Sequence, residues 1–350
     1  MTLRRNSSAF ARLELIPDTL VDVATVRTET KLFGQKIAWP LMLSPTGLTR
    51  MFHDGAELAV ARATARHGLL YSLSTMGTTR LEALADAFGG PKMFQIYIFK
   101  DRGLTRELVA RCREAGYEGL ALTVDTPVAG NRERDRVSGF SLPPRLTLAS
   151  LLSFALHPGW SLPALSGAKF DLANVSHRVD VLAGGPMSLF DYIGGQFDRS
   201  VTWRDVEWLA AEWQGPLAIK GVMTPDDGRR AIASGATGVM VSNHGGRQLD
   251  GAPAPIDQIS PVRDALGDGV DIICDGGIRR GSDVVKALAL GATACSIGRP
   301  YLYGLAAGGE AGVDRALSIL FEEFERTLVL AGINDIANLG PRHVRPARDR

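Results

Sequence analysis

The residues best suited to chemistry in this chain of 350 residues lie in one glycine-rich stretch, SNHGGRQLDG, which begins at Ser242. Within it, His244 could remove a proton from a substrate hydroxyl or α-carbon, because the histidine side chain is a common general base. Arg247 follows three residues later, and its guanidinium could donate two hydrogen bonds to a carboxylate. A lone histidine is more often a polar residue of the core, so this interpretation depends on its neighbours.

A second stretch, DGGIRRGSDVVKALALGA, begins at Asp275 and is followed by SIGRP. Glycine-rich loops expose backbone N–H groups, and the N-terminus of a helix adds a dipole that favours an anion. Arg279 and Arg299 would add positive charge. The glycines taken alone could form simple turns, but the pairing of both loops predicts a phosphate-binding site.

Three further ionisable residues have more than one interpretation each. Lys220 closes the apolar run LAIKG, where it could form a Schiff base or stabilise charge on a bound ring, unless its amine reaches the surface. Asp125 in ALTVDTP could orient an imidazole, or it could simply cap a strand. Arg132 lies in NRERDR, a mixed-charge run that is equally typical of a solvated loop.

These residues require a scaffold, and the chain repeats one pattern: a helical stretch ends at a glycine before a short apolar run. Continuous apolar strands alternating with helices predict a parallel sheet that is buried on both faces. Eight strands predict an α/β fold, a (β/α)₈ TIM barrel, with an open doubly wound sheet as the alternative. The predicted strands are Leu41–Ser44, Leu70–Ser74, Phe94–Ile98, Leu120–Val124, Leu217–Lys220, Val239–Ser242, Ile272–Asp275 and Ala294–Ile297.

Polar and ionisable residues close every predicted strand, which in a barrel is the active-site end. A shared site explains this regularity better than eight unrelated caps. The residues are Pro45, Thr46, Gly47, Ser74, Gln95, Tyr97, Thr123, Asp125, Lys220, Ser242, His244, Asp275, Gly276, Gly277, Gly298 and Arg299.

A long insertion, at about 126–203, follows the fourth predicted strand and contains proline-rich, irregular sequence. Within it, Leu148, Leu151, Leu152 and Ala155 recur at helical spacing and predict a short apolar helix face. That face could lie on a membrane, where a quinone collects electrons, or it could pack on the barrel or on a neighbouring subunit.

Composition narrows the class of protein. Hydrophobic residues make up 45% and charged residues 22%, with a net charge of +1, so no strong field would recruit nucleic acid. The three cysteines share no metal-ligand spacing, and their apolar surroundings fit a reducing, cytoplasmic location. The start lacks the apolar core of a signal peptide. The basic end, RHVRPARDR, is interpreted as a frayed tail.

At this point the sequence resembles the FMN-dependent 2-hydroxy-acid dehydrogenase and oxidase family, which includes glycolate oxidase, lactate dehydrogenase and mandelate dehydrogenase. The resemblance rests on SNHGGRQLDG and DGGIRRGSDVVKALALGA and extends from about Asn6 to about Gly340. It implies a single barrel domain over residues 1–350. Within the family, GFSLPPR followed by LHPGWSL is most similar to the mandelate dehydrogenase branch.

The resemblance implies FMN as cofactor, no metal, a homotetramer, and a role for each candidate residue. His244 would be the base, supported by Asp125, and Tyr97, Arg132 and Arg247 would bind the substrate. The implied cofactor-binding residues are Pro45, Thr46, Gly47, Ser74, Gln95, Thr123, Lys220, Ser242, Asp275, Gly276, Gly277, Ile278, Arg279, Gly298 and Arg299.

The expected reaction is oxidation of an (S)-2-hydroxy acid, mandelate-like or lactate-like, to the 2-oxo acid. The alternatives are an oxidase that passes electrons to oxygen and a flavin-binding barrel without activity. This sequence begins after the position where family members carry a substrate-binding tyrosine, which implies either truncation or weaker binding. Met76 stands where many oxidases carry tryptophan, and Gly47 leaves the flavin face open; both favour a dehydrogenase that uses an acceptor other than oxygen. Together with the apolar face of the insertion, this leads us to expect a cytoplasmic protein that can lie at the inner face of a membrane, with a quinone as the acceptor.

Overall fold

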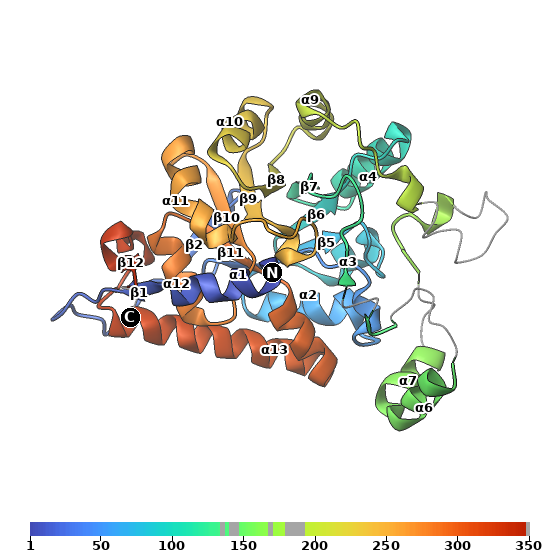
Figure 1. Ribbon diagram of the computed structural model, residues 1–350, viewed down its shortest axis with the longest axis horizontal. Coiled ribbons are helices and arrows are strands. Elements are labelled where there is room, and N and C mark those ends of the chain that lie inside the picture. Colours follow the sequence, from blue (N-terminus) through green and yellow to red (C-terminus); the bar gives the residue numbers. More distant parts are fainter. Residues whose placement is uncertain (134–136, 140–146, 167–170, 179–192, 348–350) are drawn as a thin grey trace.

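The computed structural model contains a closed barrel of eight parallel strands, shown in Figure 1, and describes residues 1–133, 137–139, 147–166, 171–178 and 193–347. All eight predicted strands are present, with ends that differ by at most two residues from those expected. The open-sheet alternative is therefore wrong. In barrel order the strands are β4 (Leu41–Leu43), β5 (Leu70–Ser74), β6 (Lys92–Ile96), β7 (Gly119–Thr123), β8 (Leu217–Val222), β9 (Gly238–Ser242), β10 (Asp271–Asp275) and β11 (Ala294–Ile297).

Helices cover the outside of the barrel, one between each pair of successive strands and one after the last. Side chains cap some of them: the Asp101 carboxylate accepts from two N–H groups of α4, and Thr224 caps α10. The longest, α13, packs against α2 and α12. The helices are α2 (Ala56–Arg66), α3 (Leu81–Ala87), α4 (Arg102–Glu114), α9 (Trp203–Trp213), α10 (Pro225–Ala233), α11 (Pro255–Leu266), α12 (Gly281–Ala289) and α13 (Arg299–Leu330).

The inside of the barrel is filled with side chains at its amino-terminal end. A short hairpin, β2 (Thr30–Leu32) and β3 (Gln35–Ile37), contributes to this inner core and closes that end. The opposite end of the barrel, where the carboxyl ends of the strands lie, is therefore the end that can hold an active site, as the sequence predicted. The inner core contains Leu32, Phe33, Ile37, Met42, Leu70, Met93, Ala121, Ala218, Met240, Ile273 and Ala294.

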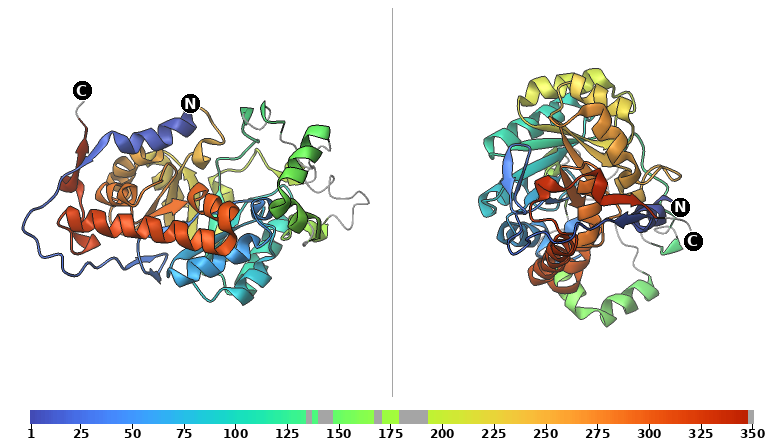
Figure 2. Two further views of the ribbon diagram at one scale, coloured as in Figure 1. Left: turned by 90° about the horizontal axis from the view of Figure 1, so that it is seen from below. Right: turned by 90° about the vertical axis from the view of Figure 1, so that its left-hand side faces the viewer.

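The two ends of the chain meet on one side of the barrel, as Figure 2 shows. Helix α1 (Thr2–Ala11) leads into β1 (Leu13–Leu15), which pairs antiparallel with β12 (Val344–Pro346). The interpretation of the C-terminal segment as a frayed tail is therefore wrong for β12. Backbone pairing with β1 holds these residues in place although their composition is basic, and residues 348–350 lie outside the described chain.

The predicted insertion lies between β7 and α9, and its described part contains α6 (Leu148–Leu156) and α7 (Pro158–Ser166). These helices project at one edge of the molecule (Figures 1 and 2), and the Trp160 indole N–H donates to the Met51 carbonyl at 2.9 Å. A second described piece, 171–178, is anchored by the fully buried side chains of Leu172 and Val175. Most of GFSLPPR lies outside the described residues.

The apolar helix face predicted in the insertion is present on α6 and faces away from the barrel. Leu148 is 88% exposed, and Leu152 is 62% exposed. The alternative in which this face packs on its own barrel is therefore wrong. Within the described ranges, no helix has the length and apolar character needed to cross a bilayer.

Candidate active site

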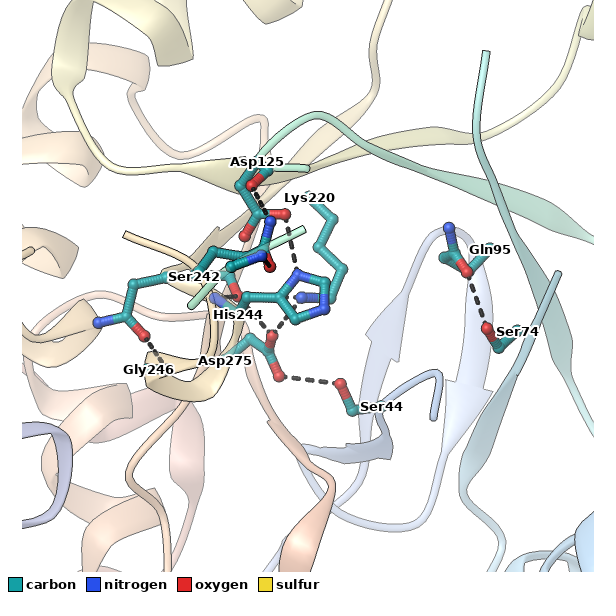
Figure 3. A network of polar contacts seen from close by, with 12 residues as sticks. Ser44, Ser74, Gln95, Asp125, Lys220, Ser242, His244, Gly246 and Asp275 are labelled. Carbon is teal, nitrogen blue, oxygen red and sulfur yellow. Dashed lines mark hydrogen bonds and ion pairs between the residues drawn. The ribbon is translucent and has the colours of Figure 1, made fainter. Parts of the chain in front are cut away.

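The carboxyl ends of the barrel strands hold a buried network of charged and hydroxyl groups, drawn in Figure 3. The ammonium of Lys220 lies 2.7 Å from an oxygen of Asp275, and each side chain is less than a tenth exposed. The Ser242 hydroxyl accepts from Lys220 at 3.0 Å and donates to Asp275 at 2.7 Å. Ser44 donates to the other Asp275 oxygen at 3.0 Å. The sequence prediction that β8, β9 and β10 end at one site is confirmed by these contacts.

The charges of this pair stabilise one another. Burial alone would lower the pKa of Lys220, but the carboxylates of Asp275 and Asp125 outweigh it, so the pKa is raised. Burial would likewise raise the pKa of Asp275, but Lys220 and the two serine hydroxyls lower it. The structure therefore places a protonated lysine at the floor of the site. This favours a cation that stabilises charge on a bound ring over the Schiff-base interpretation, which needs a neutral amine.

His244 and Asp125 form the second part of the site. The Nδ1 atom of His244 lies 2.9 Å from Asp125 Oδ1, and because a carboxylate only accepts, Nδ1 carries the proton. Nε2 is then the nitrogen that can accept a proton. The backbone of His244 has a φ of 58°, a left-handed conformation that is rare outside glycine and typical of functional sites.

A glycine makes room for the Asp125 side chain. At Gly221, where φ is +113°, a Cβ atom would lie 2.8 Å from the Asp125 Cβ. Gln248 then holds the backbone around Asp125, because its amide donates to the carbonyls of Asp125 at 3.0 Å and Val128 at 2.9 Å. The loop after β7 and the loop after β9 are thereby tied together.

The polar residues at the ends of β5 and β6 form a separate pair. The Ser74 hydroxyl donates to the Gln95 amide oxygen at 3.0 Å and accepts from the Met76 N–H at 3.1 Å. Tyr97 follows on the next inward position and packs edge-on against Phe197, with ring centroids 4.9 Å apart. Thr123 is buried at the end of β7, beside Lys220 in register. Ser74 and Gln95 lie on the opposite side of the site from Asp275 (Figure 3).

The loops after β4 and β5 are in close contact. A Cβ atom at Gly47 would lie 2.9 Å from the Cβ of Met76, and the Leu48 N–H donates to the Met76 carbonyl at 2.8 Å. Thr46 is held from below, because its hydroxyl lies 2.5 Å from the hydroxyl of the buried Tyr301. The two residues that the sequence singled out as departures, Gly47 and Met76, therefore touch.

The two arginines of the predicted anion site lie near one another. Arg279 and Arg299 lie close enough that burial and the charge of Arg279 together lower the pKa of Arg299. Within the part of the chain that the structure describes, their guanidinium groups donate only to carbonyl oxygens, Ile278 for Arg279 and Gly245 for Arg299. Arg279 lies just before α12 and Arg299 begins α13, and two neighbouring guanidinium groups without a carboxylate partner in the described chain favour an anion.

The two remaining arginines lie at the mouth of the site. Arg132 and Arg247 are both exposed. Burial and Asp125 raise the pKa of Tyr97, while the charge of Arg132 opposes the shift, so these three groups lie near one another. The structure thus brings Arg132 to the site, which favours the functional interpretation of the NRERDR run.

Several residues of the site were absent from the sequence prediction. Glu57, fully buried in α2, accepts hydrogen bonds from the Thr78 N–H and from the hydroxyls of Thr78 and Thr79 and so holds the loop after β5. Tyr301 supports Thr46 in a similar way. A glutamate within a helix is usually exposed, so the sequence around Glu57 does not indicate that its side chain is buried.

Comparison with known proteins agrees with this geometry. The chain matches the family model of the FMN-dependent dehydrogenases over residues 1–346. It is 40% identical over 349 residues to glycolate oxidase 1 of Zea mays, covering 100% of this chain and 89% of that protein. It is 41% identical over 342 residues to an L-lactate dehydrogenase of Xanthomonas campestris pv. campestris, covering 97% and 87%. The crystal structure of the monotopic membrane protein (S)-mandelate dehydrogenase has a TM-score of 0.94 to this structure, with 36% identity and coverage of 99% and 91%.

The chain therefore belongs to the FMN-dependent 2-hydroxy-acid dehydrogenase family, and its cofactor is FMN. The residues present fit that cofactor. Within the described chain, the guanidinium groups of Arg279 and Arg299 have no carboxylate partner, and two such neighbouring cations favour a phosphate. Lys220 supplies a buried cation, and Ser74 with Gln95 supplies hydrogen-bonding groups for a heterocyclic ring edge.

Proposed function

We propose that this enzyme oxidises an (S)-2-hydroxy acid with a mandelate-like or lactate-like side chain to the 2-oxo acid, with His244 as the base. The observation that carries the proposal is the His244–Asp125 contact of 2.9 Å at the mouth of a barrel that also contains the Lys220–Asp275 pair. A base with a free Nε2, a carboxylate to support its charge and a fixed cation nearby are the groups that this oxidation needs.

In this proposal Arg247 and Arg132 bind the substrate carboxylate, and the Tyr97 hydroxyl contacts the substrate oxygens. Both arginines are exposed at the rim, so the acid reaches them before it enters. His244 Nε2 then takes a proton from the substrate, and Asp125 stabilises the imidazolium that forms. Bound FMN supplies the acceptor of the two electrons released by the substrate. Lys220 holds a positive charge at the floor of the site.

The choice of substrate rests on the contact between the loops after β4 and β5. Gly47 has no side chain, and Met76 is flexible, so the space above the site accepts a larger side chain than a tryptophan at position 76 would leave. This favours an aromatic acid such as mandelate over a small aliphatic one. The similarity of fold to (S)-mandelate dehydrogenase supports the same choice.

An anaerobic absorbance spectrum of the purified holoenzyme tests the reaction. We expect the yellow flavin absorbance to bleach after addition of (S)-mandelate, and more slowly after addition of L-lactate. Faster bleaching by lactate would overturn the substrate assignment but leave the reaction class intact. A flavin that stays oxidised with both acids would contradict the proposed function.

We further propose that the enzyme works at a membrane surface, where a quinone takes the electrons. The support is the exposed apolar face of α6 and α7, which includes Leu148, Leu152 and Leu156, with Leu162 at 63% exposure. Apolar side chains presented in this way are typical of helices that lie in the membrane interface. Oxygen as acceptor and a second subunit on this face are the alternatives, and a homotetramer is the assembly that the family resemblance leads us to expect.

Flotation with phospholipid vesicles measures this attachment. Wild-type protein should float with the vesicles, and the double variant Leu148→Ser and Leu152→Ser should remain below. Leu330→Ser is the control, because that side chain is 73% exposed on the distant end of α13. Equal flotation of all three proteins would contradict the proposal, and self-association lost only in the double variant would favour a subunit contact. Turnover with a soluble quinone, compared with oxygen alone, tests the acceptor.

A further inference from the structure

Helix α1 lies against the back of the two loops that form the site. The fully buried face of this helix includes Asn6, whose side chain is 2% exposed. A Cβ atom at Gly277 would lie 2.0 Å from the Asn6 carbonyl oxygen, so the helix touches the loop after β10. One at Gly246 would lie 2.7 Å from the Leu3 nitrogen, so it also touches the loop after β9.

The amides of Asn6 and Asn243 form a reciprocal pair. Asn6 Nδ2 donates to Asn243 Oδ1 at 2.7 Å, and Asn243 Nδ2 donates to Asn6 Oδ1 at 2.8 Å. Asn243 uses its remaining capacity within its own loop, because Oδ1 accepts from the Gly246 N–H at 3.0 Å and Nδ2 donates to the Pro253 carbonyl at 2.9 Å. Its orientation is therefore set by four hydrogen bonds, two of which come from Asn6.

Asn243 directly precedes His244, whose backbone is left-handed with a φ of 58°. Such a conformation persists only where surrounding contacts enforce it. From the barrel side, the His244 N–H donates to the Ser242 hydroxyl at 3.1 Å. From the outer side, the short turn η3 (His244–Gly246) is capped by Asn243. The ring of His244 is thus aimed by two supports, and Asn6 belongs to the outer one.

Anchoring of α1 does not depend on Asn6, because other residues dock this helix. The Thr2 hydroxyl donates to Asp250 at 2.7 Å and accepts from the Gly251 N–H at 2.8 Å. Arg12 pairs with Asp257 at 2.7 Å. These contacts lie before and after Asn6 on the helix, and none of them reaches Asn243.

We propose that Asn6 is a positioning residue for His244: its amide fixes Asn243, and Asn243 fixes the turn that aims the imidazole. The proposal rests on His244 being the base of the proposed reaction. Removal of the Asn6 amide leaves one N–H and one lone pair of the Asn243 amide unpaired, with only the bonds to Gly246 and Pro253 to orient it, so the turn relaxes toward other hydrogen bonds. Displacement of a base by about 1 Å can cost about a hundredfold in rate.

The first test compares Asn6→Leu with wild type in anaerobic reduction by the 2-hydroxy acid, with the rate expressed per bound FMN. We expect a loss of ten- to a hundredfold. We also expect a larger isotope effect from deuterium on the substrate α-carbon, because misplacement of the base slows that step. The matched control is Thr2→Val, which weakens the docking of α1 without touching Asn243. The same loss in Thr2→Val, or no loss in Asn6→Leu, would overturn the proposal.

The second test does not require turnover. The Nδ1 proton of His244 should give a downfield NMR signal in wild type and in Thr2→Val, because it is bonded to Asp125. This signal should be weakened or lost in Asn6→Leu and in the isosteric Asn6→Asp, which serves if the leucine variant fails to fold. A signal unchanged in both Asn6 variants would refute the positioning role. Wild-type protein that oxidises no 2-hydroxy acid would refute the proposed function instead, and the NMR comparison would still decide the role of Asn6.

Discussion

Substitution of Asp125 by asparagine removes one charge from the site and leaves its shape unchanged. Asparagine is isosteric with aspartate, and its amide oxygen can still accept from His244 Nδ1, which lies 2.9 Å from the carboxylate. The variant loses the negative charge that faces the imidazolium. It therefore measures the electrostatic support of the base separately from its orientation.

The magnitude follows from Coulomb's law. Two unit charges about 4 Å apart interact by about 4 kcal/mol at an effective dielectric constant of about 20. The His244 and Asp125 side chains are 24% and 14% exposed, so water screens part of this, and we expect about 2–4 kcal/mol. That range corresponds to a loss of about 30- to 1000-fold in the rate of flavin reduction.

Stopped-flow reduction of the enzyme-bound flavin by a saturating 2-hydroxy acid measures this loss. Asp226→Asn is the control, because this side chain is 80% exposed and pairs with Arg229 at the surface. Stability gives a second readout: among the residues that the structure describes, the buried Asp125 Oδ2 has no hydrogen-bond partner, so the asparagine variant should unfold at no lower urea concentration than wild type. A variant that reduces its flavin at the wild-type rate would refute the role of Asp125.

Three further predictions concern the buried charges. Lys220→Met should lower the free energy of unfolding, measured in urea, by about 3–5 kcal/mol, because the buried Asp275 carboxylate loses its cation. Adding Asp275→Asn to this variant should restore most of the lost stability. A double variant as unstable as Lys220→Met alone would contradict the mutual stabilisation of the pair. Folding lowers the pKa of Asp275 and raises that of Lys220, so this pair should contribute its full stability from about pH 4 to about pH 10.4. The contribution should be lost below this range as Asp275 gains a proton and above it as Lys220 loses one. A flat profile of unfolding free energy against pH would refute this. Glu57→Gln should destabilise the fold by about 1.5–3 kcal/mol, because an amide has only one oxygen to accept the three hydrogen bonds from Thr78 and Thr79. The thermal unfolding temperature measures this loss, and an unchanged temperature would argue against the network.

The barrel was predictable from the sequence because parallel strands that are buried on both faces appear as continuous apolar runs. The strands that these runs form all point the same way, so the polar residues that follow them lie together at one end of the barrel. Lys220, His244 and Asp275 come together for this reason. The site was therefore predictable to the extent that it is built from strand ends.

The remaining contacts join residues that are far apart in the sequence and carry no local pattern. Asn6 reads as an ordinary polar residue of an amphipathic helix, yet it pairs with Asn243 across the molecule. The basic end of the chain reads as solvated, yet Val344–Pro346 forms a strand with Leu13–Leu15. Such pairings depend on which surfaces the folded barrel brings together, so composition and periodicity do not reveal them.

The contact between Gly47 and Met76 implies an order in which substitutions can accumulate in this lineage. Any side chain larger than hydrogen at position 47 begins 2.9 Å from the Met76 Cβ, closer than two carbon atoms tolerate. Position 76 could relieve this clash only by becoming glycine, because its own Cβ is the atom in contact. With any other residue at position 76 the backbone of one loop must shift, so the effect of a substitution at one position depends on the state of the other. Efforts to alter the substrate range should vary the two positions as a pair in one library.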